Sequence, residues 1–227
     1  MKFTPNQEEA LIRSIDLDNL GVIAPHKAKY YNKYSTEWLA DELRSGKSHT
    51  YTTFWKVDEG CENRIFSQWY RNKPFKVNGR TYVTAEQYMM SEKALLFGDC
   101  DSYKKIMLES DPAVCKQIGR GVQGFNQKVW DSALREIIFH GNLAKVQSDI
   151  EILDALLSTG SSVLIEASPY DDIYGAGLSK EDLLNENGTL KVMPEKWHKA
   201  GSSVRAKNHL GFVLMAVRDL FNQLIEG

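Results

Sequence analysis

The sequence predicts a mainly helical (mainly α, or α+β) domain with small β elements, and two features of the 227-residue chain lead to this expectation. Amphipathic segments that begin with helix-capping residues fill most of the chain after residue 84. The strand-like segments are short and do not alternate regularly with helices, which excludes a doubly wound sheet. We expect an N-terminal extension over residues 1–50 and one domain over residues 51–227.

Two helices are expected before the first strand. Thr4 and the proline after it form an N-cap and first-turn pair that opens a helix to about Ile15. Ser35 opens a second helix, which runs through Leu43 and is stopped by Gly46. Both helices belong to the extension, to which the sequence assigns no role.

Short strands are expected between residues 51 and 83. Residues 51–57 are rich in aromatic and β-branched side chains, which is typical of a strand, and residues 58–60 form the turn after it. Residues 75–83 form two alternating arms around Asn78-Gly79, the preferred dipeptide of a two-residue hairpin turn. This hairpin leads directly into a helix that begins near Thr84.

Helices are expected over most of the remaining chain. Asp101 is expected to cap a helix to about Glu109, Asp111 to start another together with the proline after it, and Asn126 to cap a third. The other expected elements are a helix from about Leu143 to Leu157, a buried strand at Val163–Ile165, a loop over residues 167–177 and a C-terminal helix from about Val204 to Leu224.

Composition and charge exclude several classes of protein. The formal net charge of −2 excludes a generally basic nucleic-acid binder, although it leaves room for a local basic groove. The first residues contain no apolar signal core, and no stretch reaches the roughly eighteen apolar residues of a membrane span. We therefore expect a cytoplasmic protein without membrane contact. Three cysteines without a CxxC pair and five scattered histidines give no case for a metal, and no cofactor is expected.

The helix over residues 84–99 carries two ionisable residues on an apolar stripe. Positions separated by three or four residues share one face of a helix. On this face lie Glu86, Met89, Met90, Lys93 and Phe97. Burial disfavours the charged form of a lysine on such a face and lowers its pKa, which makes the amine a better nucleophile. Glu86 is then placed to transfer protons.

A structural interpretation of the same stripe stays open. Glu86 and Lys93 lie about 10 Å apart along the helix axis at 1.5 Å per residue, which is too far for a direct ion pair. Each side chain can therefore meet a partner from elsewhere in the fold, as structural ion pairs on half-buried faces do. The spacing alone does not choose between this role and a reactive site.

A second candidate cluster follows Ile165. The segment from Glu166 to Gly177 gathers Asp171, Asp172, Tyr170, Tyr174 and the glycines Gly175 and Gly177. Glycines let the backbone approach a ligand, aromatic rings offer a surface to a base or sugar, and carboxylates stabilise a cationic transition state. The alternative is an acidic surface turn whose tyrosines cover the edge of the core.

Three other candidates are ambiguous when taken alone. Trp130 lies on a predicted helix, where a tryptophan more often packs in the core than stacks on a ligand. Arg135 alone is typical of a solvated or ion-paired side chain, and the Phe66–Tyr70 run is typical of packing.

Together these segments resemble the NADAR family, also called YbiA-like, whose name reflects an association with NAD and ADP-ribose. The resemblance covers about residues 61 to 220. The matching motifs, in chain order, are Phe66-Ser67, the span from Glu86 to Lys93-Ala94 with Phe97-Gly98-Asp99, Gly119-Arg120, Trp130 with Arg135, Ala144-Lys145 with Gln147, Glu166 to Gly177, and Asn208 to Arg218. The sequence departs from the family pattern at Val146, Tyr174, Val204 and Ala206.

The resemblance implies a YbiA-like helical fold with a short hairpin and minor strands, and an N-glycosidase that cuts the bond between a ribose C1 and a nitrogen. It implies that Lys93 attacks C1 and forms a ring-opened imine, that is, a Schiff base. We expect Glu86 to move protons and Asp171 to stabilise the cationic transition state. The expected substrate-binding residues are Arg64, Phe66, Ser67, Trp130, Arg135, Tyr174, Gly175 and Gly177.

Four functions remain open at this stage. The first is removal of ADP-ribose from guanine in DNA or nucleotides, so that the expected partner is an ADP-ribose-containing substrate. The second is hydrolysis of ribosylamino intermediates of riboflavin biosynthesis. The third is a non-catalytic module that binds ADP-ribose or NAD, and the last is a helical interaction protein. The sequence does not distinguish DNA, RNA and free nucleotide, and it does not indicate an oligomeric state.

Overall fold

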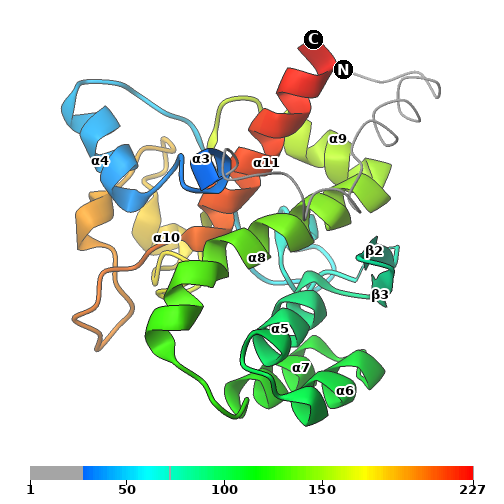
Figure 1. Ribbon diagram of the computed structural model, residues 1–227. Helices are drawn as coiled ribbons and strands as arrows, with labels where there is room; N and C mark the ends of the chain where they lie inside the picture. Colours follow the sequence, from blue (N-terminus) through cyan, green and yellow to red (C-terminus); the bar gives the residue numbers. More distant parts are fainter. Residues whose placement is uncertain (1–27, 72, 227) are drawn as a thin grey trace. The chain divides into compact units, whose positions relative to one another are not determined.

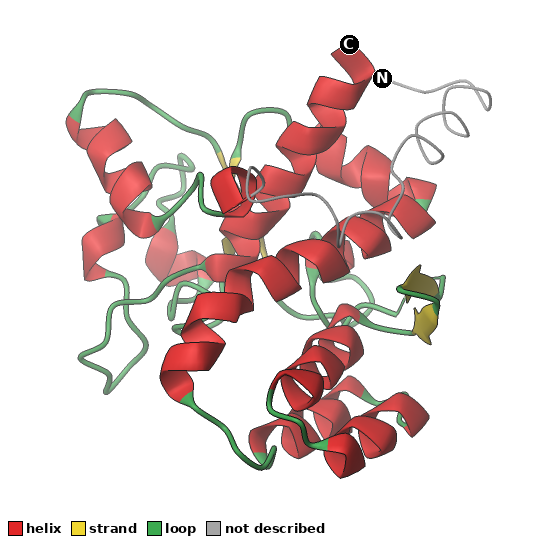
Figure 2. Ribbon diagram, viewed as in Figure 1, coloured by secondary structure: helices red, strands yellow, loops and turns green. Residues whose placement is uncertain are grey.

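The computed structural model describes residues 28–71 and 73–226, which form two compact units. Unit 1 contains residues 68–154, and unit 2 contains residues 28–67 and 155–226. Helices dominate both units and the strands are short (Figure 2), which confirms the expected fold class. The helix expected from Thr4 to Ile15 lies outside the described residues. Within the described ranges, no helix combines the length and apolar character that crossing a bilayer requires.

Unit 1 begins with the predicted hairpin. Strands β2 (Phe75–Val77) and β3 (Arg80–Tyr82) pair antiparallel, with Phe75 opposite Tyr82. Asn78 and Gly79 both adopt positive φ angles, of 50° and 73°, as a type I′ turn requires. The hairpin prediction is therefore confirmed.

The helices that follow the hairpin in unit 1 are α5 (Ala85–Leu96), α6 (Cys100–Leu108), α7 (Pro112–Arg120) and α8 (Gln127–Ser148). The last three pack on α5 (Figure 1). Glycines permit the close crossings, because a Cβ at Gly119 would lie 2.0 Å from Sδ of Met90 and one at Gly141 would lie 2.4 Å from a ring carbon of Tyr88. The predicted caps Asp111 and Asn126 each accept a hydrogen bond from a first-turn amide, and Thr84, near which the helix is expected to begin, does the same for α5.

Two predicted helix boundaries in this unit are wrong. The cap of α6 is Asp99 rather than Asp101, because one carboxylate oxygen of Asp99 accepts from Ser102 N and the other from Gln123 N. The helix expected to begin near Leu143 does not begin there, since α8 continues through this residue to Ser148. The break comes at Asp149, whose backbone is extended, and α9 (Ile150–Ser158) follows.

Unit 2 contains a two-stranded parallel sheet. Strand β1 (Tyr51–Phe54) pairs with β4 (Val163–Glu166), with Tyr51 opposite Val163. The first strand ends at Phe54 rather than Val57, because β4 offers only four residues for pairing. The predicted strand after Ser162 is thereby confirmed, with one residue more at its end.

Helix α11 (His209–Glu226) packs against β4. It begins later than the predicted Val204, because Asn208 adopts a left-handed φ of 46° that interrupts the helical backbone. Glycine is required at the crossing, since a Cβ at Gly211 would lie 2.1 Å from the carbonyl oxygen of Leu164.

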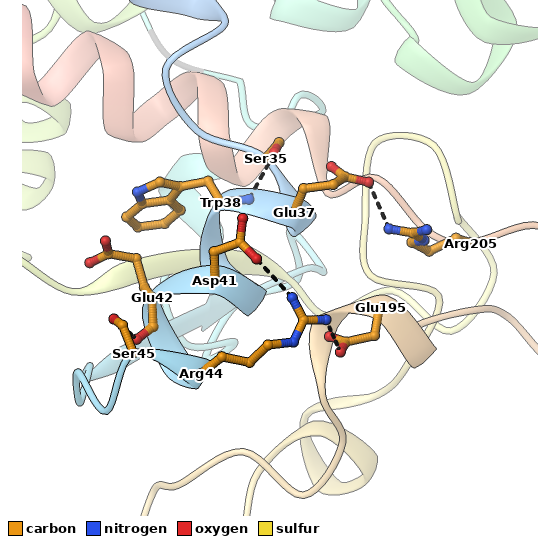
Figure 3. A network of polar contacts seen from close by, with 9 residues as sticks. All are labelled: Ser35, Glu37, Trp38, Asp41, Glu42, Arg44, Ser45, Glu195 and Arg205. Atoms are coloured by element: carbon orange, nitrogen blue, oxygen red, sulfur yellow. Dashed lines mark hydrogen bonds and ion pairs between the residues drawn. The ribbon is translucent and has the colours of Figure 1, made fainter.

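The segment before β1 also belongs to unit 2. It forms α3 (Ala28–Tyr31), which packs on α11, and α4 (Thr36–Arg44), which packs on the 3-10 turn η3 (Pro194–Lys196). As predicted, Ser35 caps α4 by accepting from Trp38 N, and Gly46 follows the helix with a φ of 83°. The ion pairs of Arg44 with Glu195 and of Arg205 with Glu37 add side-chain links on this side (Figure 3). The domain boundary near residue 50 stays a prediction.

Candidate active site

Lys93 lies near the end of α5 with its amine directed at α7. Nζ donates a hydrogen bond of 2.8 Å to the carbonyl oxygen of Gly119. The same nitrogen lies 4.3 Å from the ring centroid of Phe125 and 5.5 Å from that of Trp130. Such contacts combine a cation with the negative faces of aromatic rings. The amine of Lys93 therefore lies in an aromatic setting within unit 1.

The surroundings of Lys93 shift its proton equilibrium toward the neutral amine. Burial lowers the pKa of this half-buried amine, and the positive charge of Arg120 lowers it further. No ion pair joins Lys93 to a carboxylate of the described residues. A lysine in these conditions has a larger fraction of free amine near neutral pH, which is the reactive form for attack on carbon.

Glu86 lies two turns before Lys93 and is only 2% exposed. Its backbone amide donates to Gln68 O. Burial and the carboxylates of Glu109, Glu86 and Asp111 raise the pKa of Cys115, on α7, to about 12. Glu86 thus acts electrostatically on the helix that Lys93 also reaches, and the two residues share a face of α5 as their spacing predicts.

Trp130 and Arg135 are both carried by α8. Trp130 is 5% exposed and lies near the start of the helix, where its ring contacts Lys93. Arg135 lies further along the helix and is partly buried. The structure therefore brings Trp130 to the candidate nucleophile, which combines the packing role and the site role that the sequence left open.

Asp171 shapes the acidic loop of unit 2. Its Oδ1 accepts from the amides of Ile173 and Tyr174, at 3.0 and 2.8 Å, and its carbonyl accepts from Gly177 N at 2.9 Å. These bonds form a compact turn around one carboxylate. Asp171 and Tyr174 are partly exposed.

Two of the predicted glycines are required by the loop backbone itself. A Cβ at Gly175 would lie 2.8 Å from the carbonyl oxygen of Glu166. Gly177 has a φ of 68°, and a Cβ there would lie 2.4 Å from Lys199 N. The backbone N–H of Asn208 donates to Gly175 O, which links the loop to the start of α11. Close backbone packing is thus one reason for glycine at both positions.

Arg64, Phe66 and Ser67 lie at the 3-10 turn η2 (Arg64–Phe66), also in unit 2. Arg64 Nη1 donates to Val57 O at 3.3 Å. The Phe66 ring is 1% exposed and packs edge-to-face on Phe54, with ring centroids 5.8 Å apart. The packing of Phe66 therefore anchors this turn, in which Arg64 and Ser67 are the polar residues beside it.

The structure gathers the predicted residues in two groups. Lys93 and Trp130 meet in unit 1, where Glu86 shares the α5 face with Lys93. Asp171, Tyr174, Gly175 and Gly177 form one loop in unit 2. In the ranges 28–71 and 73–225, no group of three or more His, Cys, Asp and Glu side chains is arranged to hold a metal ion.

Two residues of unit 1 were not assigned to the site from the sequence. Phe125 lies closest to Lys93 among the aromatic rings in contact with it, but it belongs to a loop, where no periodicity marks a residue. Lys145 is 1% exposed on α8, with Nζ 5.5 Å from the Tyr70 ring centroid. Burial lowers its pKa to about 7, partly opposed by Asp149. The match of Ala144-Lys145 to a family motif was the available signal.

Lys145 should make stability depend on pH. The unfolded chain holds the proton up to the ordinary pKa of 10.5 and the folded chain only up to about 7, so the unfolded state binds more protons between these values. Stability therefore rises with pH in this window, by up to about 1.4 kcal/mol per pH unit, and Lys145 adds no slope below it. Urea unfolding between pH 7 and 9.5 should show a shallower rise for Lys145→Met than for the wild type.

The matched control is Lys105→Met, which removes an exposed lysine of α6. This variant should keep the wild-type slope. An unchanged slope in Lys145→Met would contradict the buried, neutral lysine.

A NADAR domain matches residues 53–222, so this helical chain belongs to the NADAR family. The chain is 41% identical over 159 residues to N-glycosidase R617 of Acanthamoeba polyphaga mimivirus, an alignment that covers 68% of this chain and 86% of the relative. It is 32% identical over 140 residues to protein irg-1 of Caenorhabditis elegans, covering 61% of this chain and 60% of that protein.

A bacterial relative and its solved structure extend the likeness. N-glycosidase YbiA of Escherichia coli is 27% identical over 154 residues, covering 68% of this chain and 77% of the relative. The NMR structure of E. coli YbiA superposes with a TM-score of 0.57 at 24% identity, covering 80% of this chain and 90% of that one. The expected family and the YbiA-like fold are thereby confirmed.

Proposed function

We propose that this chain is an N-glycosidase that removes ADP-ribose from guanine in DNA or nucleotides. Its family supports the general activity, since the relatives from mimivirus and E. coli are named N-glycosidases, hydrolases of N-glycosyl bonds. The observation that carries the proposal is the Lys93 amine, which is half-buried, contacts two aromatic rings and has its pKa lowered by burial and by Arg120.

In the proposed reaction the neutral amine of Lys93 attacks the ribose C1. The bond between C1 and the guanine nitrogen breaks, and the leaving nitrogen takes a proton from the carboxyl group of Glu86. The ribose ring then opens as the nitrogen of Lys93 loses a proton and the ring oxygen gains one, which leaves a protonated imine. Addition of water to this imine releases ADP-ribose and the neutral lysine, and the proton set free returns to Glu86, so that the net change is hydrolysis of one N-glycosyl bond.

Trp130 and Arg135 complete the proposed roles in unit 1. The Trp130 ring is in contact with the amine, and in our proposal it forms a wall for the base or the adjoining ribose. We assign Arg135 to binding the substrate, since a guanidinium suits phosphate oxygens.

For unit 2 we propose roles that follow from the chemistry of its residues. Asp171 stabilises the positive charge that develops on C1 and the ring oxygen, and Tyr174 offers a face for stacking. Arg64, Ser67 and the backbone of Gly175 and Gly177 contact phosphate or ribose. Phe66, buried against Phe54, acts by holding Arg64 and Ser67 in place.

Two other functions fit the same residues. Hydrolysis of ribosylamino intermediates of riboflavin biosynthesis uses the same C1–N chemistry on a smaller substrate. A non-catalytic module would bind ADP-ribose or NAD without breaking a bond. We place the binding module below guanine removal, because a lysine with a lowered pKa is suited to the imine step and is not needed for binding alone. The riboflavin reaction shares that step, so the choice of substrate decides between it and guanine removal.

One substrate comparison tests the proposal. The full chain is incubated with an oligonucleotide that carries ADP-ribosylated guanine, with the corresponding free nucleotide, and with ribosylamino-pyrimidine phosphates, and products are followed by mass spectrometry. Release of ADP-ribose with regeneration of unmodified guanine is the expected result. Loss of the pyrimidine substrates with the oligonucleotide intact would establish the riboflavin alternative. Tight binding of ADP-ribose with no product from any substrate would establish the binding module.

A further inference from the structure

A cavity of about 770 Å³ lies within unit 2 and involves none of the residues assigned to the proposed reaction. Its lining includes Trp38 and His49 from the segment before the matched NADAR domain. Ser161, Arg218 and Asn222 also line it. The volume lies within the range of about 300–1,000 Å³ that is typical of small-molecule sites. A segment outside the family match therefore helps to build this cavity.

Arg218 is a buried cation in the lining of this cavity. Its side chain is 3% exposed, and Nη1 donates to Thr159 Oγ1 at 2.6 Å. Nε has no acceptor, and no carboxylate of residues 28–71 or 73–225 forms an ion pair with the guanidinium. Burial lowers the pKa of Arg218, with partial compensation by Asp219 and Tyr34. A buried cation of this kind is costly unless an anion meets it.

The nearby acidic residues are already occupied. Asp219 accepts from Lys33 Nζ at 2.5 Å and from the Tyr34 hydroxyl at 2.7 Å. Glu42 lies 3.6 Å from His49 Nε2 and 2.8 Å from the amine of Lys47. Thr159 uses one N–H of the terminal guanidinium nitrogens, so these nitrogens retain donors that an anion in the cavity can use.

The lining of the cavity also includes aromatic rings. The Trp38 indole lies 5.7 Å from the His49 ring at an interplanar angle of 59°, and it packs edge-to-face on Tyr34 with centroids 4.7 Å apart. The helix that carries Trp38 is capped by Ser35, and Figure 3 shows its hydrogen bond and ion pairs with neighbouring segments. These links hold the ring in place before a ligand arrives, which lowers the entropic cost of binding.

We propose that this cavity is a second ligand site, which binds a mononucleotide with its phosphate on Arg218 and its base against Trp38. Two oxygens of a phosphate can accept parallel hydrogen bonds from a guanidinium. The base supplies a flat ring for the indole. The hydroxyls of Ser48 and Ser161 and the amide of Asn222 supply hydrogen bonds to the sugar between them. The site is independent of the proposed glycosidase reaction.

Adenosine 5′-monophosphate is the probe for this site. The full chain is titrated with the nucleotide while the indole N–H resonances are followed by NMR, with the Trp38 signal assigned from its absence in Trp38→Leu. Saturable movement of the Trp38 signal is expected. Adenosine, which lacks the phosphate, should bind about tenfold or more weakly, because a charge-assisted hydrogen bond is lost.

Two variants separate the site from folding effects. Arg218→Gln should weaken binding of the nucleotide about tenfold or more and leave adenosine binding almost unchanged. Ser161→Phe keeps Arg218 and fills the exposed rim, and it should weaken both ligands. The proposal is overturned if the nucleotide at millimolar concentration leaves the Trp38 signal unmoved, if it moves the Trp130 signal instead, or if both variants bind it as the wild type does.

Discussion

Replacing Lys93 with alanine is expected to lower kcat for release of ADP-ribose from guanine by about 10⁴-fold or more, since removal of a covalent nucleophile has effects of this size. The amine that hydrogen-bonds to Gly119 and contacts Phe125 and Trp130 is the atom proposed to form the imine. Steady-state rates on the modified oligonucleotide measure the effect. Binding of ADP-ribose should change far less, because the lost bond forms only during the reaction.

Borohydride supplies a direct test of the same residue. Reduction during turnover should trap an adduct of ADP-ribose mass on the peptide that contains Lys93. Lys105→Ala, an exposed lysine on α6, is the matched control and should retain both activity and the adduct. Turnover that persists in Lys93→Ala, or an adduct on another lysine such as the buried Lys145, would show that the nucleophile is assigned wrongly.

The pH profile follows from the same environment. Only the neutral amine reacts, so the rate should rise with pH through the pKa of Lys93. Burial and Arg120 hold that pKa below the ordinary 10.5, so the midpoint of the rise should also lie below it. In Arg120→Gln the midpoint should move toward higher pH, because a neighbouring positive charge is removed.

Gly177→Ala should destabilise the protein by about 3 kcal/mol, which is the scale of overpacking at a site that cannot yield. The added Cβ would lie 2.4 Å from the backbone nitrogen of Lys199, and the φ of 68° is itself unfavourable for alanine. Urea unfolding with linear extrapolation measures the change.

Gly121→Ala is the control for this substitution. Its nearest contact, with the carbonyl oxygen of Ile118, would be 3.5 Å, and its φ of −93° suits alanine. Its effect should stay within about 0.5 kcal/mol. If Gly177→Ala is as stable as the wild type but loses affinity for substrate, Gly177 acts by contact with the ligand and not through the packing of the loop.

Local signals in the sequence were sufficient for most helices and for the hairpin. Ser35, Asp111 and Asn126 cap helices as predicted, because a capping side chain bonds to amides two or three residues away. Asp99 was missed in favour of Asp101 because part of its bonding comes from Gln123 N, far along the chain.

Long-range features could not be predicted from local pattern. The pairing of β1 with β4 joins segments more than a hundred residues apart. Unit 2 likewise combines two segments that are far apart in the sequence, residues 28–67 and 155–226. The same holds at the site. Lys93 and Glu86 followed from the helical period, whereas Phe125 lies in a loop and the bond to Gly119 uses a backbone carbonyl. The spacing of residues in the sequence predicts neither of these contacts.

Asn208 also acts on the outer edge of the two-stranded sheet. Its side-chain oxygen accepts from Glu166 N and its side-chain nitrogen donates to Leu164 O, at 3.0 and 2.9 Å. A residue in a neighbouring parallel strand would offer the same donor and acceptor with its backbone. One amide side chain thus substitutes for a third strand, and these two groups of β4 are closed to strand addition by another molecule, the usual route from an open sheet edge to aggregation.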